Sequence, residues 1–162
     1  MTEKAEERKC FAVVKVRGTI SAQREVRETL QLLRLTRTNN AVLIDNRPSY
    51  VGMLYRVQNY ITWGEVSKET VALMLKKRGR FAGGKKLTDE YVERLGFKSI
   101  DTLANAIISC KTDYNKLSNV QPVFKLRPPS KGFKGKTKKS FAAGGEAGYR
   151  GERITDLIKR MI

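Results

Sequence analysis

The chain has 162 residues, with 33 lysines and arginines against 16 acids, a net charge of +17 and a pI of about 10.1. This length suits one domain, or a small domain with an extension, and is enough to bury a hydrophobic core. The charge favours a polyanionic partner, with nucleic acid first. No apolar run approaches the roughly 20 residues of a membrane-spanning helix, and the first residues do not form a signal peptide, so we expect a soluble, cytoplasmic protein without a membrane partner.

Enzyme chemistry has few possible residues in this chain. The sequence contains no histidine, which removes the commonest general base and the usual nitrogen ligand for metals. It also lacks a P-loop motif and a GxGxxG motif. Cys10 and Cys110 are the two cysteines and lie far apart in the sequence, so we expect reduced, buried thiols. The sequence therefore predicts no catalytic residue, metal, cofactor or small-molecule substrate.

Hydrophobic periodicity predicts a β-α-β-α-β unit in the first part of the chain. The segment CFAVVKV is almost continuously apolar and β-branched, which is typical of a central strand. Ser21 is a suitable N-cap for the next helix, and Leu30, Leu33 and Leu35 follow its apolar face. Trp63 is expected to pack in the core and not to stack on bases. In chain order, we expect a strand at 10–16, a helix at 22–35, a strand at 41–44, a helix covering 51–61 and a strand at 60–66.

Across residues 29–61, apolar and polar residues recur at fixed spacing without a gap. They are, in order, Leu30, Leu33, Leu35, Arg37, Asn40, Val42, Met53, Leu54, Val57, Tyr60 and Ile61. This order resembles the signature of the large-subunit ribosomal protein family named L-thirty, and the chain length resembles its long archaeal and eukaryotic form. The resemblance implies an α+β fold with a β-α-β-α-β ferredoxin-like core and a small antiparallel sheet whose first strand is central.

The resemblance also implies which residues of this stretch face ribosomal RNA. They lie in and beside two polar loops: Arg34, Arg37, Asn39, Asn40, Arg47 and Ser49. We expect a compact layout to bring the two loops together. Arg24 and Arg27, on the preceding helix, fit a solvated face and RNA contact equally well.

Residues 67–162 are predicted to form a mostly helical extension of a core at residues 1–66. Ser67, Thr88 and Asp101 are candidate N-caps of three short helices. An edge strand is expected at 120–126, because Pro122 argues against a central position. A glycine-rich basic loop at 130–151 then leads to a docking helix at 153–162, where helical spacing of apolar residues returns.

Two blocks in the extension carry more charge than solubility requires. The predicted RNA contacts are Lys76, Lys77, Arg78, Arg80, Phe81, Lys85 and Lys86 in the first block, and Lys131, Phe133, Lys134, Lys136, Lys138, Lys139, Phe141, Tyr149 and Arg150 in and after the second. Glycine permits close approach to phosphates, lysine neutralises them, and aromatic rings stack on bases. From composition alone, the second block also fits a disordered, solubilising segment.

These observations favour a structural constituent of the large ribosomal subunit that binds the large ribosomal RNA, with a place near the small 5S RNA as a further expectation. Its partners would be ribosomal RNA and neighbouring ribosomal proteins, and we do not expect a homo-oligomer. A general nucleic-acid-binding or chaperone protein outside the ribosome is the alternative that charge alone permits. An RNA-modifying enzyme is a third class, which the missing catalytic groups disfavour.

Overall fold

The computed structural model describes residues 7–162, so most of the mobile end that mixed charges predict at residues 1–9 lies outside the described residues. In chain order the elements are β1 (Cys10–Lys15), α1 (Arg24–Leu32), β2 (Asn40–Asp45), α2 (Pro48–Arg56), β3 (Ile61–Glu65), α3 (Lys68–Arg78), α4 (Asp89–Arg94), α5 (Ile100–Ile108), η1 (Tyr114–Lys116), β4 (Phe124–Lys125), η2 (Phe141–Ala143), β5 (Gly148–Tyr149), η3 (Gly151–Arg153) and α6 (Ile154–Met161). The strands form one sheet in the order β4-β2-β1-β3-β5.

β1 is the central strand, as the resemblance implied. All of its residues are buried, which explains its nearly continuous apolar sequence. It pairs antiparallel with β2 and β3, and Val13 lies opposite both Val42 and Trp63. The predicted α+β class with an antiparallel core sheet is therefore confirmed. β5 makes the sheet mixed, because it runs parallel to β3.

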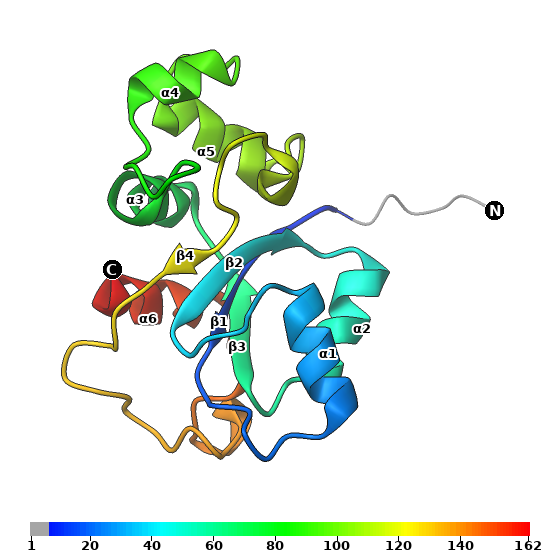
Figure 1. The fold of residues 1–162 in the computed structure, drawn as a ribbon. Helices are drawn as coiled ribbons and strands as arrows, with labels where there is room; N and C mark the ends of the chain where they lie inside the picture. The colour runs from blue at the N-terminus through cyan, green and yellow to red at the C-terminus, as the bar shows by residue number, and fades with distance from the viewer. Residues whose placement is uncertain (1–6) are drawn as a thin grey trace.

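Helices cover both faces of the sheet (Figure 1). Alternate side chains of β1 point to opposite faces, so they enter two hydrophobic clusters. The cluster under α1 and α2 includes Phe11, Val13, Leu30, Val42, Leu54 and Trp63. The cluster under α3, α5 and α6 includes Ala12, Val14, Met74, Leu103 and Ile158. Trp63 is 4% exposed, which confirms its predicted packing role.

The structure corrects the boundaries predicted for the first helix. Gln23, and not Ser21, occupies the N-cap position, and the helix ends at Leu32. Arg34 has a φ of 62°, so the chain has already left the helix when it reaches Leu35. The buried leucines continue past the helix, and periodicity therefore did not reveal its end.

The second helix also differs from its prediction. It begins at Pro48, which suits the first helical turn, so Ser49 lies on the helix and not in a loop. Ile61 was assigned both to the apolar face of this helix and to the strand expected at 60–66. It begins β3, which confirms the strand and ends the helix earlier. Apolar spacing could not separate the two because both elements pack into the same cluster.

The three short helices of the extension are confirmed. Ser67 caps α3 by accepting a hydrogen bond from the backbone of the first turn. Thr88 occupies the N-cap of α4 without a side-chain hydrogen bond. At α5 the cap is Ser99, and Asp101 lies within the first turn. An acid is favourable near a helix N-terminus in either position, so sequence alone did not distinguish them.

The last part of the chain adds to both the sheet and the core. β4 is an edge strand as predicted, but it pairs with β2 over two residues only. β5 lies inside the segment that we predicted as a loop. The docking helix is confirmed as α6, with Ile154, Leu157, Ile158 and Met161 buried. The division of the chain at residue 66 stays a prediction, and strands from both sides of it share the sheet.

Candidate nucleic-acid interface

The turn at residues 36–39 holds Arg37 exposed at one end of the sheet. Lys15 lies beneath it, 2% exposed, and donates from Nζ to the carbonyl oxygen of Thr36 at 3.1 Å. The backbone N–H of Asn39 donates to the carbonyl of Lys15 at 2.8 Å. Burial lowers the pKa of Lys15. β1 therefore supports the turn, a role that sequence reasoning missed because Lys15 lies in an apolar strand.

The chain that leaves β4 passes beside this turn. The backbone N–H of Leu126 donates to the carbonyl of Asn39 at 3.2 Å, and that of Arg127 donates to Met161 at 2.8 Å. Arg78 has a lowered pKa, mainly through burial and then through the like charges of Arg127 and Arg80. Two separate segments, the end of α3 with the residues after it and the chain after β4, thus bring like charges close to Arg78. Arg127 was not among the predicted contacts, because it stands outside both basic blocks.

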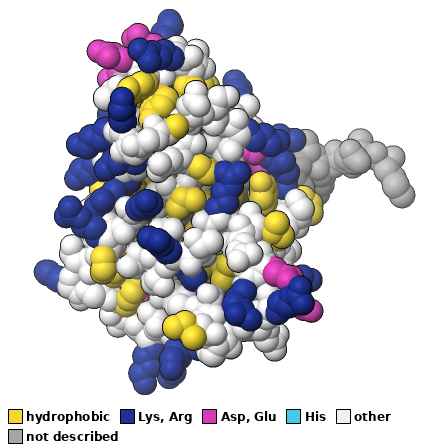
Figure 2. Space-filling view, in the orientation of Figure 1, with side chains coloured by type: hydrophobic (Ala, Val, Ile, Leu, Met, Phe, Trp, Pro, Cys, Tyr) yellow, Lys and Arg dark blue, Asp and Glu magenta, His cyan; other side chains and the backbone are white. Residues whose placement is uncertain are grey.

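We call Arg37, Arg78, Arg80 and Arg127 the basic face. In Figure 2, Lys and Arg side chains crowd the left-hand edge of the molecule, on the side where Figure 1 places α3, β4 and the chain that follows β4. Acidic side chains are few along that edge and gather at the top and right of the view. The fold therefore concentrates cations from both halves of the sequence on one side.

The first basic block forms the end of α3 and a short hairpin. Arg80 and Lys86 pair in an antiparallel bridge, and the Phe81 backbone N–H donates to the carbonyl of Lys85 at 2.7 Å. Gly83 and Gly84 have φ values of 87° and 78°, which favour glycine at the turn. The hairpin is tied to the body by bonds such as that from the Ala82 N–H to Asn119, 2.8 Å long. Its lysines extend from an ordered backbone.

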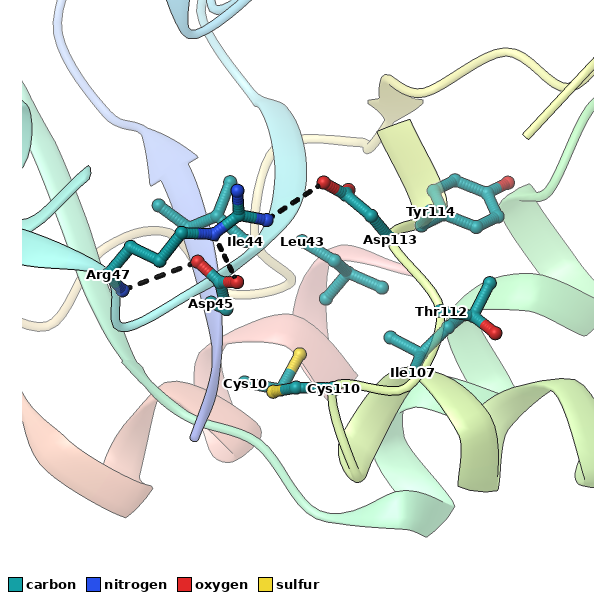
Figure 3. A pocket seen from close by; sticks show the side chains of 10 residues that line it. All are labelled: Cys10, Leu43, Ile44, Asp45, Arg47, Ile107, Cys110, Thr112, Asp113 and Tyr114. Atoms are coloured by element: carbon teal, nitrogen blue, oxygen red, sulfur yellow. Dashed lines mark hydrogen bonds and ion pairs between the residues drawn. The ribbon is translucent and has the colours of Figure 1, made fainter. Parts of the chain in front are cut away.

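The second signature loop lies at the other end of β2, so the structure does not bring the two loops together as we expected. A strand of six residues separates them by roughly 20 Å. Arg47 donates to Asp45 at 2.6 Å and to Asp113 at 3.2 Å, as Figure 3 shows. The pKa of Arg47 is raised, mainly by its hydrogen bond to Asp45. Arg47 therefore links β2 to the segment before η1.

The basic loop at 130–151 is organised around one buried carboxylate. Glu146 accepts from the Gly135 backbone N–H at 2.9 Å through Oε1 and from Arg150 Nη2 at 2.7 Å through Oε2. Arg150 is 8% exposed and also donates from Nε to Thr62 of β3 at 2.7 Å. Arg150 is thus an internal tie between the loop and the sheet. In the structure the loop is folded against the sheet, which favours an ordered loop over a disordered, solubilising segment.

The predicted site residues differ in exposure. Exposed are Arg34, Arg37, Ser49, Lys76, Lys77, Lys85, Lys86, Lys131, Lys134, Lys136, Lys138, Lys139 and Tyr149. Half-buried are Asn39, Arg47, Arg78, Arg80, Phe81, Phe133 and Phe141, and buried are Asn40 and Arg150. Among residues 7–162, the cations in ion pairs are Arg24, Arg47, Lys76 and Arg150. Most of the predicted cations therefore remain available to a polyanion.

The four aromatic candidates have internal contacts. Phe81 packs on Tyr91, with ring centroids 4.0 Å apart, and Phe133 packs against the core. Tyr149 donates its hydroxyl to Glu65 at 2.7 Å, which is the main reason why its pKa is raised to about 12. The guanidinium carbon of Arg150 lies over the Phe141 ring, 5.0 Å from its centroid. The residues at which sequence predicted base stacking thus also hold the hairpin and the loop in place.

The described residues also bear on the expectations for metal ligands, cysteines and membrane spans. Over residues 7–162 there is no group of three or more His, Cys, Asp or Glu residues that could hold a metal ion. Cys10 is buried, which raises its pKa to about 12, and Cys110 beside it is half-buried (Figure 3). No helix in the same range has the length and apolarity needed to cross a membrane.

The sequence of this chain is similar to those of known ribosomal proteins. The family described as ribosomal protein L30p/L7e matches residues 11–61. Over its length, the chain is 45% identical to the large ribosomal subunit protein uL30 of Thermofilum pendens, covering 94% of this chain and 98% of the relative. It is 44% identical to that of Methanopyrus kandleri, covering 91% and 100%. The chain therefore belongs to the ribosomal protein L30p/L7e family, in the form represented by full-length archaeal uL30 proteins.

Proposed function

We propose that this chain binds the large ribosomal RNA as a structural component of the large ribosomal subunit. The single observation that carries the proposal is the match along nearly the whole chain to proteins named for that subunit. Family membership makes the chain a ribosomal protein and not an enzyme. Ribosomal RNA and neighbouring ribosomal proteins are its proposed partners.

The distribution of charge supports RNA as the main partner. The basic face and the hairpin at 80–86 place arginines and lysines on an ordered backbone, with glycines that permit close approach to phosphates. Loops of this kind suit the irregular surface of folded RNA, whereas sequence readers of duplex DNA place a helix or a β-ribbon in the major groove. The alternative of a general nucleic-acid chaperone has no relative in its favour among the matches above.

The direct experiment is sedimentation of ribosomal subunits from cells that express the tagged chain, followed by ultraviolet cross-linking and sequencing of the attached RNA. We expect the chain to sediment with the large subunit and its cross-links to fall in the large ribosomal RNA. A place near the small 5S RNA, which the family resemblance implies, predicts cross-linked sites close to 5S contacts. Sedimentation with free protein, or cross-links spread over unrelated RNAs, would contradict the proposal.

The mode of binding has its own test at Glu146. Non-specific attraction by charge and binding by the folded loop predict opposite changes in RNA affinity when this carboxylate is removed. Glu146→Gln raises the net charge by one, so non-specific attraction would strengthen RNA binding. If the folded loop is what binds, the substitution weakens binding severalfold, because it removes a buried partner of Arg150. Glu152→Gln, on an exposed side chain, changes the charge equally and is the matched control. Equal behaviour of the two variants in filter binding would contradict the role of the ordered loop.

A further inference from the structure

A hollow of about 430 Å³ lies between the basic loop and α6. Phe141, which is half-buried, gives it apolar surface, and Lys134, Arg153 and Arg160 supply cations. Its volume falls in the range of roughly 300 to 1,000 Å³ that is typical of small-molecule sites. The hollow therefore has room for one nucleotide, but not for a helical segment of RNA.

The loop wall of the hollow is held in one shape. A Cβ atom on Gly145 would lie 2.1 Å from the carbonyl oxygen of Lys139, and one on Gly135 would lie 2.6 Å from that of Gly144. The carbonyl of Lys139 accepts from the N–H groups of Glu146 and Ala147. This close backbone packing leaves no space for a side chain at Gly135 or Gly145. The hollow is a property of the folded loop and not a gap beside a loose one.

The cations of the hollow have unused donors. Arg150, buried at one side, uses Nε and Nη2 for Thr62 and Glu146, while its Nη1 forms no hydrogen bond within residues 7–162. Arg153 lies 5.8 Å from the Phe141 ring and makes no ion pair among the described residues. Arg160 uses Nη1 to donate to Gly132 at 2.8 Å. An anionic group at this position would meet several guanidinium groups at once.

Asp156 distinguishes this hollow from a simple phosphate site. It lines the hollow on the same helix as Arg160, and it too makes no ion pair in the described part of the chain. A carboxylate repels phosphate, but it accepts hydrogen bonds from the ring N–H and amino groups of a nucleobase. The hollow thus combines cations for a phosphate, apolar surface for a ring and an acceptor for a base edge.

We propose that this hollow takes one unpaired nucleotide of RNA, with its phosphate at Arg153 and Arg160 and the donor edge of its base at Asp156. The base would lie against the half-buried ring of Phe141. This inference rests on the proposed RNA-binding function and adds to it a recognition site for single-stranded RNA. The basic face, which shares no residue with the hollow, binds phosphates without regard to base pairing.

The test uses the full chain and two probes, a seven-nucleotide single-stranded RNA of mixed sequence and a 20-base-pair RNA duplex. Arg153→Gln is compared with Lys159→Gln, which removes an equal charge from an exposed position of α6 outside the hollow. We expect Arg153→Gln to weaken single-strand binding about tenfold and duplex binding no more than Lys159→Gln does. Equal losses for both variants on both probes would overturn the proposal.

A second pair of variants separates base recognition from charge. Asp156→Ala and Glu152→Ala each raise the net charge by one, and both positions are exposed. Attraction alone would strengthen binding of both probes in both variants. We expect Asp156→Ala to weaken single-strand binding about fivefold, because the base loses its acceptor, while Glu152→Ala does not weaken it. Circular dichroism checks folding, and stronger single-strand binding by Asp156→Ala overturns the site.

If the parent chain binds neither probe, the proposed function itself fails, and the hollow fails with it. If the parent binds both probes and the matched variants do not differ, only the nucleotide site fails. The two failures are therefore distinguishable in one titration series.

Discussion

The loops at the two ends of β2 are similar in sequence and different in structure. Each places an arginine beside asparagine and a hydroxyl residue. Arg37 stands exposed on a turn that Lys15 and backbone hydrogen bonds support. Arg47 is held by Asp45 and Asp113, and its guanidinium lies 5.4 Å from the ring centroid of Tyr50. One arginine is available to a partner, and the other already joins two parts of the protein.

The difference shows that the net charge of a loop says little until its nearest acids are known. Asp45 stands two residues before Arg47 and was visible in the sequence. Asp113 stands 66 residues away, and only the packing of the extension against β2 brings it to the loop. The same packing leaves the turn of Arg37 beside Arg127, where cations accumulate. Tertiary structure has assigned opposite roles to two similar segments.

The largest effect should come from a buried apolar residue at the end of α1, shortly before the turn of Arg37. Leu33 is 3% exposed, and Leu33→Ala should lower the free energy of unfolding by about 2 to 5 kcal/mol through lost burial and the cavity left behind. Its neighbour Leu32 is 73% exposed, so Leu32→Ala should change the free energy of unfolding by about 0.5 kcal/mol or less. Urea denaturation measures both. Similar losses in the two variants would contradict the difference in burial between Leu33 and Leu32.

The next effect concerns RNA binding and separates the two arginines directly. Arg37→Ala should weaken binding to large-subunit RNA about tenfold, because one charge-assisted phosphate contact is lost. Arg47→Ala should weaken it less than threefold, because two carboxylates already satisfy that guanidinium. Both variants carry the same charge, so filter binding at one salt concentration compares them. Equal weakening would contradict the distinction between the loops.

Much of the core could be predicted because local pattern and tertiary packing agree there. The apolar run of β1 identified the central strand, and Ser67 identified the start of α3. The predicted helix ends were wrong where tertiary packing, and not helical periodicity, places an apolar residue in the core. Leu35 and Ile61 keep the apolar spacing but lie outside the helices. β5 was not predicted, because glycine and tyrosine in a basic loop give no strand pattern. Its pairing with β3 joins segments that lie far apart in the sequence.

The RNA contacts stay a prediction, and the structure adds which of the predicted cations are exposed and how they are arranged. The acid-free blocks drew attention to the hairpin and the basic loop, which are indeed exposed and ordered. Lys15, Arg127 and Arg153 were missed, since each stands outside a cationic block and depends on contacts with distant segments. Arg150 lay inside the predicted set, yet its burial against Glu146 is set by the fold of the loop.

A smaller effect is expected on stability, and here the two variants should rank in the opposite order. Arg47→Ala removes the bridge between Asp45 and Asp113 and should lower the free energy of unfolding by about 1 kcal/mol or less, because Arg47 is 41% exposed and solvent screens the pair. Arg37→Ala should leave stability unchanged within about 0.5 kcal/mol. Thermal melts of both variants at the same pH provide the measurement. Greater destabilisation by Arg37→Ala would reverse the roles that we assign to the loops.

The smallest expected change is in the salt dependence of binding, and it is the most specific one. Each neutralised phosphate contributes about 0.7 to 0.9 to the slope of log affinity against log salt, so six to ten contacts give a slope of roughly −4 to −9. Arg37→Ala should make this slope shallower by about one contact's share, whereas Arg47→Ala should leave it unchanged. A variant that lost affinity only through partial unfolding would keep the parent slope for its folded fraction. The slope therefore tells a lost phosphate contact from a damaged fold, and an unchanged slope in Arg37→Ala would remove Arg37 from the RNA-binding surface.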